Sequence, residues 1–271
     1  MVRKLFKHEF IAYIRALLPM YVVLLGIAAL TRFVVFFESD SAVYNIVIWS
    51  SIIALVIASI VCLVLSFLNV VTRYYKNMFT HEGYLTLTLP VTSAQHIWVK
   101  VTAGVVSILA GFVMIVLAVC VATAGELNIE LFKALFYLLK EELIGTKGVY
   151  AVYVIEFILL IIVALFASIL LFYACISIGQ LSNKNRVVSA IGVFFGYYFI
   201  TQIISTIGII LMRSFSVQDE LVWWILWFFF GEKTGTQMHI FFLVSVLFMS
   251  SFGLLYFAVS NYILKKKLNL E

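Results

Sequence analysis

The sequence predicts an all-α integral membrane protein with six transmembrane helices, an N-terminal interfacial helix and a re-entrant or interfacial segment before the last span. Of its 271 residues, 65% are hydrophobic and only 11% are charged, whereas a soluble domain is nearer half apolar and a quarter charged. The apolar residues stand in continuous runs, unlike the short alternating segments of an outer-membrane barrel. Only 2 prolines interrupt the chain, which suits long helices.

Residues 1–16 have the pattern of an amphipathic helix that lies on the membrane surface. Apolar residues recur at three- and four-residue steps, and most basic residues fall elsewhere on the helical wheel. The apolar positions are Leu5, Phe6, Phe10, Tyr13, Ile14 and Leu17. Such a helix is attracted to anionic lipids. The alternative is a basic inner flank of the first span.

Six apolar runs are each long enough to cross a bilayer, which takes about 20 helical residues. They cover approximately 17–37, 43–71, 97–124, 149–178, 187–212 and 239–264. We see no internal boundary, so we expect one membrane domain over residues 1–271. Segments 126–148 and 213–237 should lie outside the cell, the first as an amphipathic helix. In the second, the tryptophan-rich stretch Leu221–Phe230 is too short to cross and should be interfacial or re-entrant.

The basic residues predict the orientation. With the N-terminus inside, 12 of the 18 Lys and Arg residues lie on the inner side, and nine of the 13 acidic residues lie on the outer side. The positive-inside rule therefore predicts cytoplasmic termini and a multi-pass protein of the cell membrane. Topology explains the net charge of +5, so we expect no nucleic-acid partner. Cys62, Cys120 and Cys175 fall in apolar runs, where buried free thiols are expected.

The sequence contains no recognisable catalytic or metal-binding motif. The dipeptides at 8–9 and 81–82 begin as the zinc motif HExxH does, but Ala12 and Leu85 stand in place of the second histidine. The sequence also lacks a GxxxxGK[ST] phosphate loop, so the chain cannot bind ATP in that way. We therefore expect no catalytic residue, metal or cofactor in this chain.

Two charged residues lie inside predicted spans, near the expected outer ends. A charge at the bilayer centre costs about 2.5–3.5 kcal/mol, so we expect Arg32 and Glu156 to form a structural ion pair. Snorkelling of Arg32, or contact with a substrate, are the alternatives. In the fifth span Gly192 and Gly196 form a GxxxG motif, which permits close helix packing.

The segment 73–100 is the longest polar interruption in the first half of the chain. It contains Glu82-Gly83-Tyr84, then Leu89-Pro90-Val91, then Lys100 at the start of a long span. This order resembles the ABC-2-type permease family, the membrane subunits of ABC exporters. The layout is also similar, with a basic N-terminal helix, six spans and re-entrant material before the last.

The resemblance implies a permease subunit that is driven by a separate ATPase. In that family the loop between spans two and three carries a coupling helix, which corresponds here to about Thr72–Glu82 in the cytoplasmic loop 72–92. The implied ATPase-coupling residues are Arg73, Tyr74, Lys76, Phe79, His81 and Glu82. Two ATPase copies would bind ATP and Mg, and a second permease half, the same chain or a homologue, would complete the transporter.

The resemblance also places spans two and five beside the translocation path. The candidate path residues are five polar side chains of span five, Tyr197, Tyr198, Gln202, Ser205 and Thr206. The surface around them is mostly apolar and aromatic, which suits an amphipathic or hydrophobic cargo such as a peptide toxin, an antimicrobial peptide or a lipid-like drug better than an ion. The alternatives are a non-pumping membrane scaffold, a peptide-immunity protein, or a membrane enzyme of another kind.

We predict that Leu221–Phe230 does not cross the membrane. Ten helical residues span about 15 Å, half of the hydrocarbon thickness. Single cysteines at positions 219 and 232 should therefore both react with a membrane-impermeant thiol reagent added from outside. Labelling of either position only from the cytoplasmic side would contradict the six-span topology.

Overall fold

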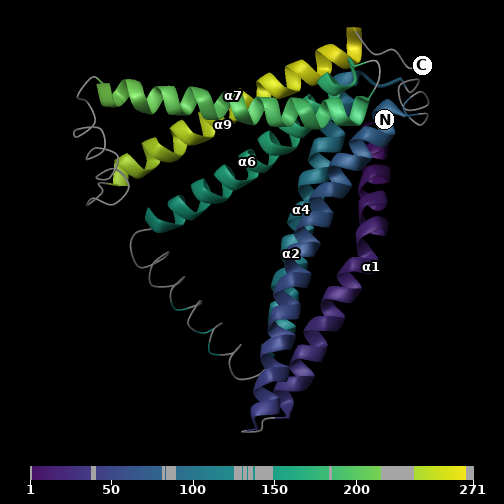
Figure 1. Ribbon diagram of the computed structural model, residues 1–271, viewed down its shortest axis with the longest axis vertical. Coiled ribbons are helices and arrows are strands. Elements are labelled where there is room, and N and C mark those ends of the chain that lie inside the picture. The colour runs from purple at the N-terminus through teal and green to yellow at the C-terminus, as the bar shows by residue number, and fades with distance from the viewer. Residues whose placement is uncertain are drawn as a thin grey trace. The chain divides into compact units, whose positions relative to one another are not determined.

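Long α-helices make up the described part of the chain (Figure 1). The computed structural model describes residues 2–37, 41–80, 90–124, 149–182, 185–214 and 235–266, with Gly83, Glu130, Lys133 and Tyr137 between them. Its helices are α1 (Val2–Phe36), α2 (Ala42–Phe79), α4 (Ser93–Ala122), α6 (Val149–Gly179), α7 (Arg186–Ser214) and α9 (Gly235–Lys266). All six are long and apolar enough to cross a membrane, which confirms the predicted all-α fold with six spans.

The chain divides into two compact units, residues 1–145 and 146–269. Unit 1 contains α1, α2 and α4, and unit 2 contains α6, α7 and α9. In each unit the first helix packs against both of the others. The expectation that both units form one membrane domain stays a prediction. Most of segment 126–148 and all of Leu221–Phe230 lie outside the described residues.

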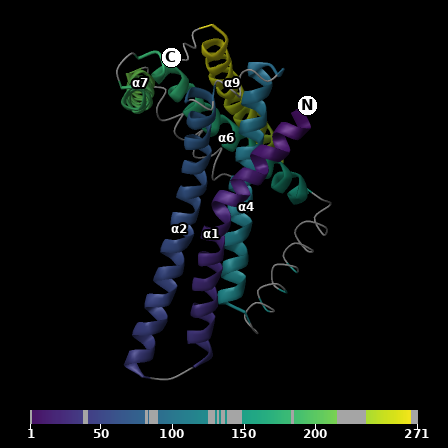
Figure 2. The same ribbon diagram turned by 90° about the vertical axis from the view of Figure 1, so that its right-hand side faces the viewer.

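Helix α1 is continuous over 35 residues, about 52 Å at 1.5 Å per residue. Residues 2–16 are helical, as predicted, but they run without a break into the first span. Pro19 lies inside the helix, where it removes a backbone hydrogen bond and bends the axis. Figure 2 shows that α1 changes direction partway along its length. Surface binding by residues 2–16 stays a prediction.

The predicted second span ends at Val71, whereas helix α2 continues for eight more residues and ends at Phe79. The segment expected to form a separate coupling helix is therefore, as far as Phe79, the last two turns of α2. Thr92 begins α4 with a capping box, in which its side chain accepts from the Gln95 amide and the Gln95 side chain accepts from the Thr92 amide. This cap satisfies amide groups that would otherwise lack partners.

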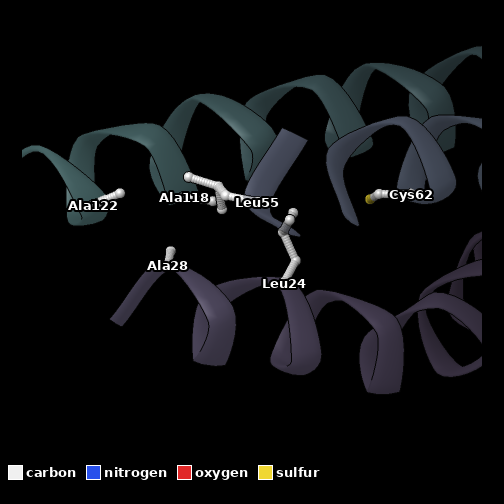
Figure 3. Close-up of a cluster of buried hydrophobic side chains, with 6 residues drawn as sticks. All are labelled: Leu24, Ala28, Leu55, Cys62, Ala118 and Ala122. Atoms are coloured by element: carbon white, nitrogen blue, oxygen red, sulfur yellow. The ribbon is translucent and has the colours of Figure 1, made fainter. Parts of the chain in front are cut away.

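The apolar core of unit 1 is built from small and medium side chains of its three helices. Figure 3 shows Leu24 and Ala28 of α1 pointing toward the other two helices. The cluster consists of Leu24, Ala28, Leu55, Cys62, Ala118 and Ala122. In a membrane, lipid tails are as apolar as leucine, so close van der Waals contact rather than burial drives such packing. Alanines at these positions let the helices approach closely.

In unit 2, close approach of α6 to α7 depends on Gly179. A Cβ atom at this position would lie 2.6 Å from the Cα of Ala190. By contrast, a Cβ at Gly192 or Gly196 would meet no described atom within 4 Å. The GxxxG motif therefore makes no close helix contact among the described residues, because its face of α7 is open within unit 2. The close glycine contact occurs instead at the α6–α7 turn.

We predict that Gly179→Ala destabilises the protein, whereas Gly192→Ala does not. The first change forces a methyl group into the backbone of α7, and overpacking of this kind typically costs about 1–3 kcal/mol. Thermal unfolding of both variants in detergent measures the difference, and Gly192→Ala is the matched control. Equal melting temperatures for the two variants would contradict the observed packing.

Candidate functional site

A buried carboxylate, Glu9, lies at the end of unit 1 that contains the N-terminus of α1. It is only 4% exposed. Helical spacing places it in line with Tyr13 and Leu17, and all three are on the buried side of α1. The sequence thus puts an acidic side chain on the face of α1 that packs against α2 and α4.

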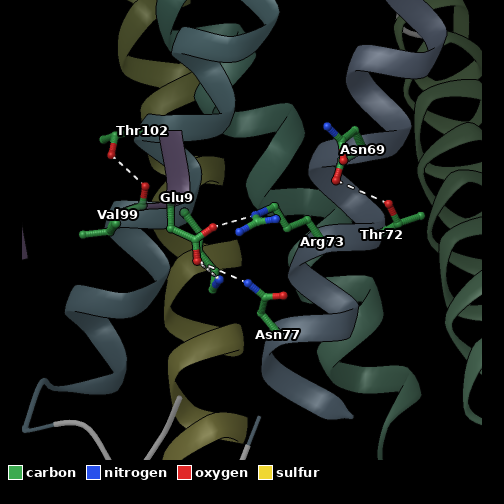
Figure 4. Close-up of polar contacts among 8 residues, drawn as sticks. Glu9, Asn69, Thr72, Arg73, Asn77, Val99 and Thr102 are labelled. Atoms are coloured by element: carbon green, nitrogen blue, oxygen red, sulfur yellow. Dashed lines mark hydrogen bonds and ion pairs between the residues drawn. The ribbon is translucent and has the colours of Figure 1, made fainter. Parts of the chain in front are cut away.

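Glu9 binds three side chains from two other helices (Figure 4). From α2, Arg73 Nε donates to Glu9 Oε2 at 2.7 Å, and Asn77 Nδ2 donates to Oε1 at 3.3 Å. From α4, Lys100 Nζ donates to Oε1. We name Glu9, Arg73, Asn77 and Lys100 the Glu9 cluster. One carboxylate therefore connects all three helices of unit 1.

The Glu9 cluster combines two cations with one anion. Lys100 is 1% exposed, so its ammonium group depends on Glu9 for charge compensation. The Arg73 side chain is 26% exposed and its guanidinium lies 5.3 Å from the centre of the Tyr13 ring, a favourable cation–π distance. His96 is fully buried one turn before Lys100, and neither ring nitrogen has a hydrogen-bond partner among the described residues.

The Glu9 cluster is arranged to hold three helices together by ionic and hydrogen bonds; we call this arrangement a clamp. Both oxygens of Glu9 accept hydrogen bonds from charged or amide donors, so the carboxylate is poorly placed to remove a proton from a substrate. Within the described ranges, no group of three His, Cys, Asp or Glu side chains could hold a metal ion.

The cysteines are free, with Cys62 and Cys175 buried and Cys120 half-buried, so the prediction of buried free thiols is confirmed for the first two.

The predicted ATPase-coupling residues fall into four groups. Tyr74 and Phe79 are buried and pack edge-to-face, with ring centres 5.6 Å apart, so they support the end of α2 and are not available to a partner. Arg73 belongs to the Glu9 cluster, while Lys76 is exposed. His81 and Glu82 lie outside the described residues, so their docking role stays a prediction.

The polar residues predicted for the translocation path lie on α7. Tyr198, Gln202 and Ser205 are exposed within unit 2. Thr206 is also exposed, and its hydroxyl donates to the Gln202 carbonyl at 2.8 Å. Tyr197 differs, because its hydroxyl hydrogen-bonds the hydroxyl of Tyr256 on α9. It therefore joins two helices of unit 2.

The intramembrane carboxylate Glu156 has a histidine partner that the sequence analysis did not identify. Its Oε1 lies 2.7 Å from Nδ1 of His239. Arg32 belongs to unit 1 and Glu156 to unit 2, so their predicted ion pair stays a prediction. The sequence signal for His239 was weak, since it stands at the boundary of the predicted last span.

Sequence reasoning also missed Glu9, Asn77 and His96. A signal for Glu9 was present, because this acid interrupts an otherwise apolar helical stripe four residues from both Leu5 and Tyr13. Its partners could not be chosen from the sequence, since Arg73 and Lys100 are 64 and 91 residues away. The sequence predicts Arg73 in the cytoplasmic loop and Lys100 at the start of the third span, and neither position indicates contact with Glu9.

We predict strong coupling between Glu9 and Lys100 in a double-mutant cycle. Breaking a buried pair by removing one partner typically costs about 3–5 kcal/mol, because the remaining charge stays buried without compensation. Glu9→Gln and Lys100→Met should each be strongly destabilising, and the double variant should cost clearly less than the sum. Chemical or thermal unfolding in detergent measures this.

The control for that cycle is Lys76→Met, which removes an exposed lysine from the same end of unit 1. This change should alter the free energy of unfolding by no more than about 0.5 kcal/mol. Additive losses in the Glu9 and Lys100 variants would show that the two residues are not coupled.

Comparison with known proteins assigns no family. No protein-family model matches the chain. No curated protein and no solved structure shows significant similarity to it. The functional argument therefore depends on the residues and geometry described above.

Proposed function

We propose that this chain is the permease subunit of an ATP-driven ABC-2-type exporter in the cell membrane, with both termini in the cytoplasm. It moves an amphipathic or hydrophobic cargo outward and uses ATP that a separate subunit hydrolyses. The observation that carries the proposal is the attachment of both helices that flank the 80–92 loop to the same buried carboxylate, Glu9.

This attachment gives the loop a mechanical connection to the membrane helices. Helix α2 enters the loop at Phe79 and α4 leaves it at Ser93. Arg73 and Asn77, in the last two turns of α2, and Lys100, in the second turn of α4, all bind Glu9 of α1. A partner that displaces the loop therefore moves three helices as one body.

The expected orientation puts the loop on the side where an ATPase could reach it. The positive-inside rule places the Glu9 cluster at the cytoplasmic end of unit 1. Lys76 is exposed there, and the acidic Glu82 follows three residues after α2 ends. Charges of both signs in this part of the sequence suit a polar, reversible docking contact.

Helix α7 supports the assignment of a path for cargo. Its exposed surface combines large apolar side chains with Tyr198, Gln202 and Ser205. Such a mixed surface suits a second permease half and an amphipathic cargo between the two halves, since both need apolar contact with a few polar groups. The second half is the same chain or a homologue.

The test is reconstitution with an ATPase. The chain should co-purify with a phosphate-loop ATPase from its own cells, and the pair in liposomes should show cargo-stimulated ATP hydrolysis. Glu82→Lys should uncouple hydrolysis from transport while the protein stays inserted, because it reverses the charge at the docking loop. Glu130→Lys, the same change at an exposed position expected outside the cell, is the matched control.

One outcome would contradict the proposed function, and a second would contradict the role of Glu82 in it. Failure to recruit any ATPase would favour the non-pumping scaffold or peptide-immunity protein. Unchanged coupling in Glu82→Lys would remove Glu82 from the docking contact.

A further inference from the structure

The contact between α6 and α9 contains a carboxylate–imidazole pair that the proposed function does not use. Glu156 of α6 and His239 of α9 have side chains that are 27% and 39% exposed. The Glu156 Oε1 to His239 Nδ1 distance of 2.7 Å is a short hydrogen bond, in which the imidazole N–H donates to the carboxylate. With a neutral imidazole, the pair carries one negative charge.

The second oxygen of Glu156 has no hydrogen-bond partner in the part of the chain that the structure describes. Oε2 is buried and receives no hydrogen bond from any described residue. A buried acceptor without a hydrogen bond destabilises the folded protein, and the cost is larger when the acceptor is charged. The site therefore has an unfilled requirement for a cation or a hydrogen-bond donor.

Aromatic rings flank this carboxylate along the same helix contact. Tyr153, Glu156 and Phe157 share one face of α6, since they are three and four residues apart. The Tyr153 ring lies 4.8 Å from the His239 ring, and the Phe157 ring lies 6.5 Å from that of Phe242 on α9. The carboxylate thus sits between two aromatic contacts, and aromatic faces attract cations.

This combination favours an organic cation over a metal ion. One carboxylate and one imidazole supply fewer ligands than the four of a typical structural zinc site, and the described residues contain no larger ligand group. An ammonium or guanidinium group needs only one charged acceptor and neighbouring rings. Its attached apolar part would contact Phe157, which is 53% exposed.

We propose that Glu156, His239 and the two flanking aromatic pairs form a binding site for the ammonium or guanidinium group of a cationic amphipathic cargo. The inference rests on the proposed function, because it assigns a charge to the exported cargo. Arg32 is the competing donor within the chain: if it occupied Oε2, as the sequence-based ion pair requires, an external cation would gain nothing there.

Two fluorescent probes that differ only in charge test the proposal. Monodansylcadaverine carries a primary ammonium group, and its N-acetyl derivative is neutral. Each is titrated into the 271-residue chain in lipid nanodiscs, and empty nanodiscs give the background. The cationic probe should bind at least about tenfold more tightly, which corresponds to about 1.4 kcal/mol. No ATPase is present, so this outcome is independent of the test of transport.

Substitutions assign the preference to the site. Glu156→Gln should reduce the preference for the cationic probe to within about twofold, Glu156→Asp should keep part of it, and the control Glu130→Gln should keep all of it. Thermal unfolding confirms that each variant is folded. Equal binding of the two probes by the wild-type protein, or an undiminished preference in folded Glu156→Gln, would overturn the inference. A preference that appears only in Arg32→Met would also overturn it and would support the Arg32–Glu156 pair.

Discussion

The burial of Glu9 is the constraint on which the arrangement of unit 1 depends. A carboxylate that is almost entirely removed from solvent must be compensated by charge and hydrogen bonds, or it becomes too costly to keep. Here the compensation comes from Arg73, Asn77 and Lys100 on two other helices. Because Lys100 is itself buried, the requirement is mutual. The ends of α1, α2 and α4 therefore cannot separate without exposing uncompensated charges.

Different contacts hold the helices together in the two units. Unit 1 combines an ionic clamp at one end with closely packed alanines, Leu24 and Leu55 along its length. Unit 2 depends on the close contact at Gly179, on aromatic contacts such as Phe172 with Phe194, and on the hydroxyl contact between α7 and α9. Among the described residues, its carboxylate Glu156 has a hydrogen-bond partner on one of its two oxygens. The clamp suits transmission of force, whereas the half-satisfied carboxylate suits ligand binding.

The sequence predicted the helices well because hydrophobic runs of more than 20 residues have few alternatives in a membrane. Their ends were less accurate, since α2 continues through Thr72–Phe79 and α1 begins before its apolar run. The roles of individual side chains were harder to predict from the sequence. Arg73 and Lys100 look like boundary charges in the sequence, and only the fold brings them to Glu9. The GxxxG motif stays a prediction, because it makes no close contact among the described residues and spacing alone does not specify a partner helix.

The most direct test of this account is the distance between the exposed ends of α1 and α2. Spin labels are attached at positions 7 and 76, which are both exposed, in a variant without the native cysteines. Double electron–electron resonance spectroscopy then gives the distribution of distances between the two labels. We predict one narrow distribution that does not change when the proposed partner ATPase binds or hydrolyses ATP, and that broadens in Glu9→Gln. A wild-type distribution that is broad, or that shifts with nucleotide, would contradict the claim that Glu9 holds these helices as one body.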